Sequence, residues 1–95
     1  MSRKLDETQL EAAIATLPKW KLERGELVQS TSFGDFKQAM EFVNQVAALA
    51  EEANHHPDID IRYNRVRLAL VTHDSGGITQ KDIDLAKKID SALPK

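Results

Sequence analysis

The chain has 95 residues, of which 41 % are hydrophobic and 29 % are charged. This length predicts a single domain over residues 1–95, whose modest core favours oligomerisation. The 13 Lys and Arg residues against 15 Asp and Glu residues give a net charge of -2, which excludes a strongly basic nucleic-acid binder. The absence of cysteine excludes disulfides, thiolate metal sites and cysteine nucleophiles.

The sequence also lacks the apolar segments of membrane-spanning and secreted proteins. Its longest uninterrupted apolar run, residues 46–50, is far shorter than the roughly 20 residues that a membrane helix needs. The basic residues near the N-terminus are followed by no apolar stretch, so no secretory signal is expected. We therefore expect a cytoplasmic protein that binds neither membrane nor nucleic acid.

The first half of the chain predicts a helix followed by a hairpin. Residues 6–17 form the predicted helix, with Asp6 as its cap. Residues 20–33 form the predicted hairpin, in which Gly25 tolerates the positive φ of a tight turn. The helix has one apolar face at the spacing i, i+3, i+4 and i+7, made of Leu10, Ala13, Ile14 and Leu17.

Residues 35–53 predict the longest helix, with Asp35 as its cap. Its apolar arc is about 180° wide, whereas a single core face needs only roughly 100°. Such a helix is either deeply buried or covers both its own sheet and a partner subunit. In a chain this small we favour the partner subunit.

The second half predicts another hairpin and a last helix. Residues 58–72 alternate between apolar and polar side chains around a turn at residues 64–65. Residues 74–77 form a loop, Thr79 and Asp82 resemble a capping box, and Pro94 sits at the end of the last helix. The expected fold is therefore α+β: a four-stranded antiparallel sheet with three helices packed on one face, in the order α-β-β-α-β-β-α.

The three histidines are the main candidates for chemistry. His55 and His56 follow the long helix, and adjacent extended side chains reach one pocket only if the backbone turns between them. His73 lies at the end of the last strand. Because the second hairpin is antiparallel and closely connected, its register brings His73 back beside the other two. We expect all three histidines at one end of the sheet.

Three other residues have both structural and functional interpretations. Glu51 lies one helical turn before His55, where a carboxylate can orient an imidazole or simply be solvated. Asp82 is explained structurally as the capping acid. Trp20, the single tryptophan, is more often a core residue than a stacking platform.

The residue types alone leave two chemistries open. Three histidines and a carboxylate can bind a metal ion, although their spacing is not that of a helical metal site. Equally, imidazole can act as acid and as base near neutral pH, so the same set suits proton transfer.

The spacing of these residues resembles the signature of one family, the pterin-4a-carbinolamine dehydratases. The pattern is Glu51-x3-His55-His56-Pro57-x5-Tyr63-x9-His73-x8-Asp82. The similarity extends to the tract at residues 72–86, to Trp20 and to Phe33-x-x-Phe36, and it covers about residues 6–93.

The resemblance implies an activity. The family dehydrates 4a-hydroxytetrahydropterin to quinonoid dihydropterin and so recycles the pterin cofactor of aromatic amino acid hydroxylases. It requires no metal and no organic cofactor. Its members have the fold expected above and assemble as dimers or tetramers, here through the helix at residues 36–53 and the sheet edge.

The resemblance also implies residue roles. His56 would be the main proton-transfer residue, while His55 and His73 bind and polarise the leaving hydroxyl. Glu51 would support the histidines or meet the substrate, and Trp20 would stack nearby. The polar edge of the pterin would be held by Asn54 and by the backbone of Val71, Thr72, His73 and Asp74.

One position departs from the family pattern. Animal members carry an acid immediately before the histidine pair, where this chain has Asn54, which hydrogen-bonds but carries no charge. Animal members also serve as dimerisation partners of a transcription factor, so the alternative function is a non-catalytic interaction module of the same fold.

Overall fold

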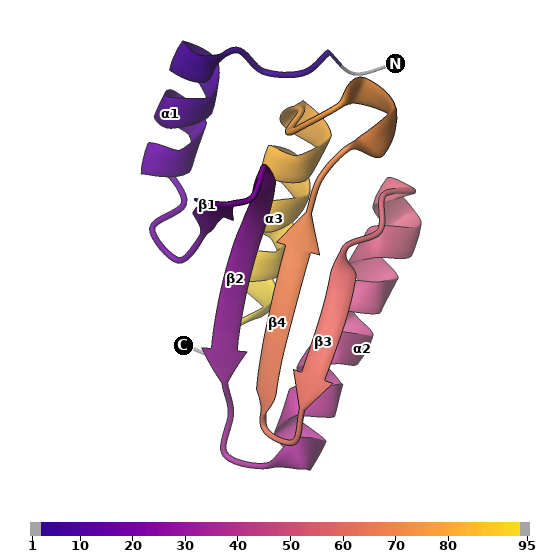
Figure 1. The fold of residues 1–95 in the computed structure, drawn as a ribbon. Coiled ribbons are helices and arrows are strands. Elements are labelled where there is room, and N and C mark those ends of the chain that lie inside the picture. The colour runs from indigo at the N-terminus through magenta and orange to yellow at the C-terminus, as the bar shows by residue number, and fades with distance from the viewer. Residues whose placement is uncertain (1–2, 94–95) are drawn as a thin grey trace.

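The computed structural model describes residues 3–93, and its elements follow the predicted order (Figure 1). A short 3-10 turn, η1 (His73–Ser75), occupies part of the predicted loop. Pro94, expected at the end of the last helix, lies outside the described residues. The helices are α1 (Glu7–Ala15), α2 (Phe36–Ala53) and α3 (Gln80–Ala92). The strands are β1 (Lys21–Glu23), β2 (Glu26–Ser32), β3 (Asp58–Arg62) and β4 (Arg65–Leu70).

The strands form one antiparallel sheet in the order β1-β2-β4-β3. Both predicted hairpins are present, and β2 and β4 pair at the centre of the sheet. In the second hairpin Asp58 pairs with Ala69, so the segment before β3 lies beside the segment that follows β4. This register places the end of α2 next to η1.

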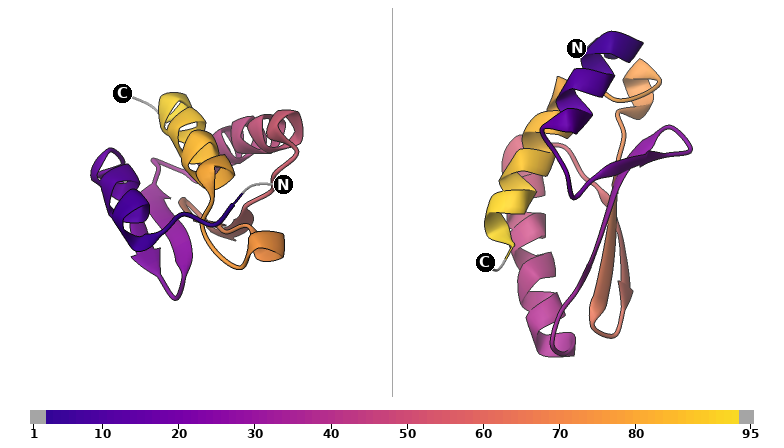
Figure 2. Two further views of the ribbon diagram at one scale, coloured as in Figure 1. Left: turned by 90° about the horizontal axis from the view of Figure 1, so that it is seen from above. Right: turned by 90° about the vertical axis from the view of Figure 1, so that its left-hand side faces the viewer.

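The helices pack on one face of the sheet. Figure 2 shows α2 and α3 on the same side of the strands, and α1 lies at the end of the sheet near β1. Along β4 the side chains alternate, so Val66 and Leu68 are buried beneath the helices while Arg65 and Arg67 are exposed on the other face. The α+β prediction is therefore confirmed.

The predicted helix starts are also confirmed. The Asp6 carboxylate accepts a hydrogen bond from the Gln9 N–H at 2.8 Å. Asp35 accepts from the Gln38 N–H, also at 2.8 Å. At the start of α3 the capping box of Thr79 and Asp82 is formed. Each side chain satisfies an N–H group that has no partner within its own helix.

The apolar arc of α2 is wider than the surface that the core covers. Its exposed side includes Phe36, Ala47 and Ala53. No helix among residues 3–93 is long and apolar enough to cross a membrane. The residues of α2 that are buried against the sheet and α3 are Ala39, Phe42, Val43, Val46 and Ala50.

Candidate active site

The three histidines line one surface hollow at the end of the sheet. The hollow has a volume of about 390 Å³ and lies where the end of α2, the end of β4, η1 and the start of α3 meet. We call it the histidine hollow. It is lined by Asn54, His55, His56, Val71, Thr72, His73, Asp74 and Lys81.

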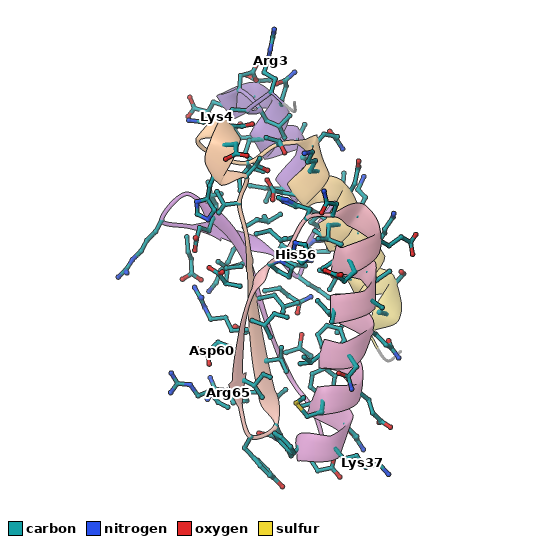
Figure 3. All side chains as sticks on the ribbon, turned by 90° about the vertical axis from the view of Figure 1, so that its right-hand side faces the viewer. Arg3, Lys4, Lys37, His56, Asp60 and Arg65 are labelled. Atoms are coloured by element: carbon teal, nitrogen blue, oxygen red, sulfur yellow. The ribbon has the colours of Figure 1, made fainter. Side chains whose placement is uncertain are left out.

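A sharp turn after α2 directs the two adjacent histidines to different partners. Asn54 ends the helix in the left-handed conformation, with φ 50° and ψ 43°. Asparagine adopts this conformation more readily than most residues, because its short polar side chain bonds locally. The N–H of His55 still bonds to the Ala50 carbonyl at 3.1 Å. The turn allows both histidines to line the hollow (His56 is labelled in Figure 3).

His55 is held by a buried carboxylate. Its Nε2 lies 2.5 Å from Oδ1 of Asp82, and the two side chains are 12 % and 0 % exposed. The other oxygen, Oδ2, accepts from the Thr79 N–H and from the Thr72 hydroxyl, both at 2.9 Å. An ionised carboxylate only accepts hydrogen bonds, so Nε2 of His55 must donate. In the neutral imidazole, Nδ1 is then the acceptor.

The hydroxyl groups of Thr72 and Thr79, which lie next to the His55–Asp82 pair, both take part in hydrogen bonds. The Thr72 hydroxyl donates to Asp82, so the hydroxyl of Thr79, at 2.8 Å, donates to Thr72. Thr79 Oγ1 in turn accepts from the Lys81 N–H at 3.2 Å. Among the described residues, no buried polar side-chain atom lacks a partner. This network fixes the position of Asp82 and through it the ring of His55.

His56 also contacts a carboxylate, but this one is exposed to solvent, whereas Asp82 is buried. Its Nε2 lies 2.5 Å from Oε2 of Glu51, and the two side chains are 57 % and 77 % exposed. The helical spacing favoured a contact between Glu51 and His55, but the turn at Asn54 carries His55 inward to Asp82. Glu51 does not line the hollow and reaches it only through His56.

His73 is presented by the η1 turn. It is exposed, and its carbonyl accepts the N–H of Gly76 at 3.0 Å. Gly76 has a φ of 75°, a conformation that glycine adopts without strain and that closes the turn. Within residues 3–93 no hydrogen bond to the His73 ring is found, so both ring nitrogens are available to a ligand.

Two proposed site residues, Glu51 and Trp20, do not line the hollow, and Trp20 lies in the core. Its side chain is 3 % exposed, and its indole N–H donates to Oδ1 of Asp90 at 2.8 Å. The same oxygen accepts from Gln29 at 3.2 Å. Trp20 therefore connects the segment just before β1 to α3 and is too buried to stack on a molecule in the hollow, in line with its core interpretation.

Sequence reasoning overlooked two residues of the site. Asp82 was explained by its capping role, which involves only one of its two oxygens. Its place in the spaced motif was the signal that could have assigned it to His55. Lys81 also lines the hollow, but no motif or spacing in the sequence pointed to it. Within the described residues, no three His, Asp or Glu side chains are grouped so that they could hold a metal ion.

Comparisons with known proteins identify the class to which this fold and hollow belong. A family model described as "Pterin 4 alpha carbinolamine dehydratase" matches residues 3–92. The chain therefore belongs to the pterin-4-alpha-carbinolamine dehydratase family. The resemblance noted in the sequence is confirmed.

Individual relatives agree with this assignment. The chain is 58 % identical, over 88 % of its length and 91 % of the relative's, to a protein of Acidobacterium capsulatum provisionally named pterin-4-alpha-carbinolamine dehydratase. A Chloroflexus aurantiacus protein with the same provisional name is 52 % identical over 95 % of this chain and 97 % of its own.

Two solved structures share the fold. One is the crystal structure of a transcriptional coactivator/pterin dehydratase from Brucella melitensis, with a TM-score of 0.92 and 33 % identity over 97 % of this chain and 100 % of that one. The other is a pterin dehydratase-like protein described as a RuBisCO assembly factor in the alpha-carboxysome. Its TM-score is 0.63 at 24 % identity, over 77 % of this chain and 84 % of that one, and the likeness concerns the fold alone.

Proposed function

We propose that the chain dehydrates 4a-hydroxytetrahydropterin to quinonoid dihydropterin and water, and thereby recycles the pterin cofactor of aromatic amino acid hydroxylases. The observation that carries the proposal is the meeting of three histidines, from two distant segments, in one hollow. Membership of the dehydratase family supports it. A hollow of about 390 Å³ is also within the usual size of small-molecule sites.

The reaction needs two proton movements. A proton is delivered to the 4a hydroxyl, the C4a–O bond breaks, and water leaves. The N5–H proton is removed, so the double bond forms and the charge balances. Imidazole supplies acid and base forms near neutral pH, which suits both movements.

His56 is the main proton-transfer residue in this proposal. Its side chain is open to water, and its Nε2 lies 2.5 Å from Oε2 of Glu51, where the carboxylate accepts a hydrogen bond from the protonated ring nitrogen. His55 acts differently: its Nε2 is committed to Asp82, which leaves Nδ1 as the ring nitrogen that binds the leaving hydroxyl. His73, presented on η1, is the third group that binds and polarises this hydroxyl.

The pterin's polar edge is held beside the histidines. Asn54, Val71 and Asp74 line the hollow and supply side-chain or backbone groups for it. Thr72 contributes less directly, because its hydroxyl donates to Asp82 and its N–H bonds to the Gly77 carbonyl. Its role is therefore to support the Asp82 network.

The direct test is an assay on chemically generated 4a-hydroxytetrahydropterin, with and without a chelator. The expected result is accelerated loss of water to the same extent in both conditions. Acceleration that the chelator abolishes would replace histidine proton transfer by a metal-dependent reaction. No acceleration by the folded protein would overturn the proposed activity.

A second candidate function is a non-catalytic interaction module. The Brucella melitensis relative is described as a transcriptional coactivator as well as a pterin dehydratase, which favours retaining this candidate. The exposed side of α2 is the surface that such a module would use. One result distinguishes the two functions. If the protein is inactive in the dehydratase assay but binds a partner through α2, it is the interaction module.

The active form in this proposal is a homodimer or homotetramer. The outer edge of β3 pairs with no strand among the described residues, which leaves its backbone groups available to a second copy. Beside it, Phe36 and Tyr63 stack with ring centroids 6.5 Å apart and are 49 % and 67 % exposed. Light scattering on the purified chain is expected to give twice or four times the chain mass, and a monomer would contradict the assembly.

A further inference from the structure

The face of the sheet opposite the helices, here called the open face, carries a concentration of arginine. Three of the five arginines in the chain, Arg62, Arg65 and Arg67, belong to β3 and β4 and point to this face. Figure 3 shows Asp60 and Arg65 projecting on the side of the sheet away from α2. No described helix covers them, so the guanidinium groups remain accessible.

The strand register brings like charges together. In one cross-strand row, Arg65 of β4 lies between Ser32 of β2 and Arg62 of β3. In the next row, Arg67 lies between Ser30 and Asp60. Like charges directly opposite each other destabilise a sheet, so an anion near the Arg62–Arg65 pair would be stabilising.

The acidic neighbours neutralise this charge only in part. Arg62 Nε bonds to Asp60 at 3.0 Å, and Arg67 lies 3.7 Å from Glu23. Both carboxylates are about half exposed, at 48 % and 41 %, so water screens these pairs. Arg65 makes no ion pair within residues 3–93. Three guanidinium groups thus face two solvated carboxylates.

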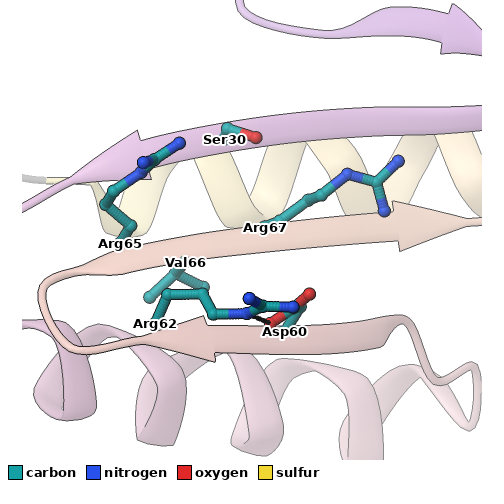
Figure 4. A pocket seen from close by; sticks show the side chains of 6 residues that line it. All are labelled: Ser30, Asp60, Arg62, Arg65, Val66 and Arg67. Carbon is teal, nitrogen blue, oxygen red and sulfur yellow. Dashed lines mark hydrogen bonds and ion pairs between the residues drawn. The ribbon is translucent and has the colours of Figure 1, made fainter.

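These side chains line one hollow, which offers several hydrogen-bond donors. Its volume is about 240 Å³. Figure 4 shows Ser30 on β2 between the guanidinium groups of Arg65 and Arg67, which both extend from β4. The residues lining it are Ser30, Asp60, Arg62, Arg65, Val66 and Arg67.

We propose that this hollow binds a phosphate group, as free phosphate or as a small phosphomonoester. A guanidinium group presents paired N–H donors that match two oxygens of a phosphate. A phosphate group accepts from Arg65, whose charge no carboxylate among the described residues pairs, and from Arg67, and its remaining oxygen accepts from the Ser30 hydroxyl. A carboxylate has one charge and two oxygens, so it fills this donor set less completely.

The phosphate site is separate from the histidine hollow. Arg67 precedes His73 by six residues of mostly extended chain, roughly 20 Å at the usual rise of a strand. The two sites also lie at opposite ends of β4, since the phosphate site involves Arg65 and Arg67 and the histidine hollow involves residues 71–74. The phosphate proposal therefore holds or fails independently of the proposed dehydratase activity.

The test is an NMR titration of the isotope-labelled chain with inorganic phosphate at constant ionic strength, with chloride as the reference anion. Saturable shifts are expected at the Nε–H signals of Arg65 and Arg67. Substitutions R65Q and R67Q should each weaken binding roughly tenfold or more, since each removes a charged hydrogen-bond donor. The control K87Q removes the same charge from α3, on the helical side, and should leave binding unchanged.

A second arm identifies the source of the phosphate group. Glycerol 3-phosphate should bind at least as tightly as inorganic phosphate if the site takes phosphomonoesters, and more weakly if it takes free phosphate. Three results would overturn the site: equal shifts with chloride, no saturation by millimolar phosphate, or equal weakening by R67Q and K87Q. The dispersion of the amide spectrum verifies that each variant is folded.

Discussion

His55 and His56 are adjacent in the sequence, and each lies 2.5 Å from a carboxylate oxygen, yet their surroundings differ. The His55 pair is nearly buried, with Asp82 fixed by the Thr79 N–H and the Thr72 hydroxyl. The Glu51–His56 pair lies in water and has no further support from the network. The turn at Asn54 produces the difference.

The difference shows that the role of a histidine–carboxylate contact depends on how deeply the carboxylate is buried and on its other hydrogen bonds. A buried carboxylate with several donors orients an imidazole and commits one ring nitrogen, because leaving any of these groups unpaired is costly. An exposed carboxylate holds its partner weakly and allows exchange with water. The proposed mechanism therefore gives Asp82 and His55 a positioning role and gives His56 the proton transfer. The following substitutions test this division.

The largest effect is expected from His56→Ala. Loss of the main proton-transfer group should lower the dehydration rate by roughly 10²–10⁴-fold. The side chain is exposed, so the free energy of unfolding should change by no more than about 0.5 kcal/mol. Rates from the carbinolamine assay and urea denaturation measure the two quantities. Full activity in this variant would remove His56 from the mechanism.

Asp82→Ala should instead act first on stability. It leaves the Thr79 N–H, the Thr72 hydroxyl and His55 without their acceptor, which should lower the free energy of unfolding by about 3 kcal/mol. Urea denaturation measures the loss. The matched control is Asp84→Ala, in the same helix, where an exposed carboxylate accepts a hydrogen bond from Gln80. A loss no greater than that of the control would contradict the anchoring role of Asp82.

Substitutions at Asn54 test the turn that separates the two histidines. Asn54→Val places a β-branched side chain at φ 50°, which should destabilise the fold by roughly 1–2 kcal/mol. Asn54→Gly permits the same backbone conformation and serves as the control, with little change expected in thermal unfolding. If both variants were equally destabilised, the side chain of Asn54, not its backbone, would carry the effect.

Glu51→Gln should have the smallest effect. The carboxylate is exposed, and solvated pairs of this kind contribute about 0.2–1 kcal/mol, so the rate should fall by no more than roughly fivefold. Glu52→Gln, one residue on and also exposed, is the control and should leave the rate unchanged. A rate loss as large as that of His56→Ala would show that Glu51 itself takes part in proton transfer.

The sequence was sufficient for the fold because local signals and pairing signals agreed. Asp6 and Asp35 begin helices as their side-chain chemistry predicts, and Gly25 lies in the first hairpin turn with a φ of 80°. The short connection between β3 and β4 determines their register, which predicts the approach of His73 to the histidine pair. These inferences needed only neighbouring residues and one hairpin.

Contacts that depend on how elements pack could not be predicted in this way. The pairing of Asp82 with His55 joins residues 27 positions apart and requires α3 to pack beside the end of α2. The position of Trp20 depends on Asp90, 70 positions away. The Glu51–His56 contact depends on a left-handed residue that helical spacing does not foresee. Periodicity describes one element at a time and is silent on these contacts.

The capping box of α3 has a consequence for motion as well as for structure. Because Asp82 both begins α3 and holds His55, any fraying of the first turn of this helix also releases the imidazole. Local opening and loss of ring orientation are then the same event. Amide hydrogen exchange at the Thr79 and Asp82 N–H groups would consequently report how often the histidine hollow is correctly assembled.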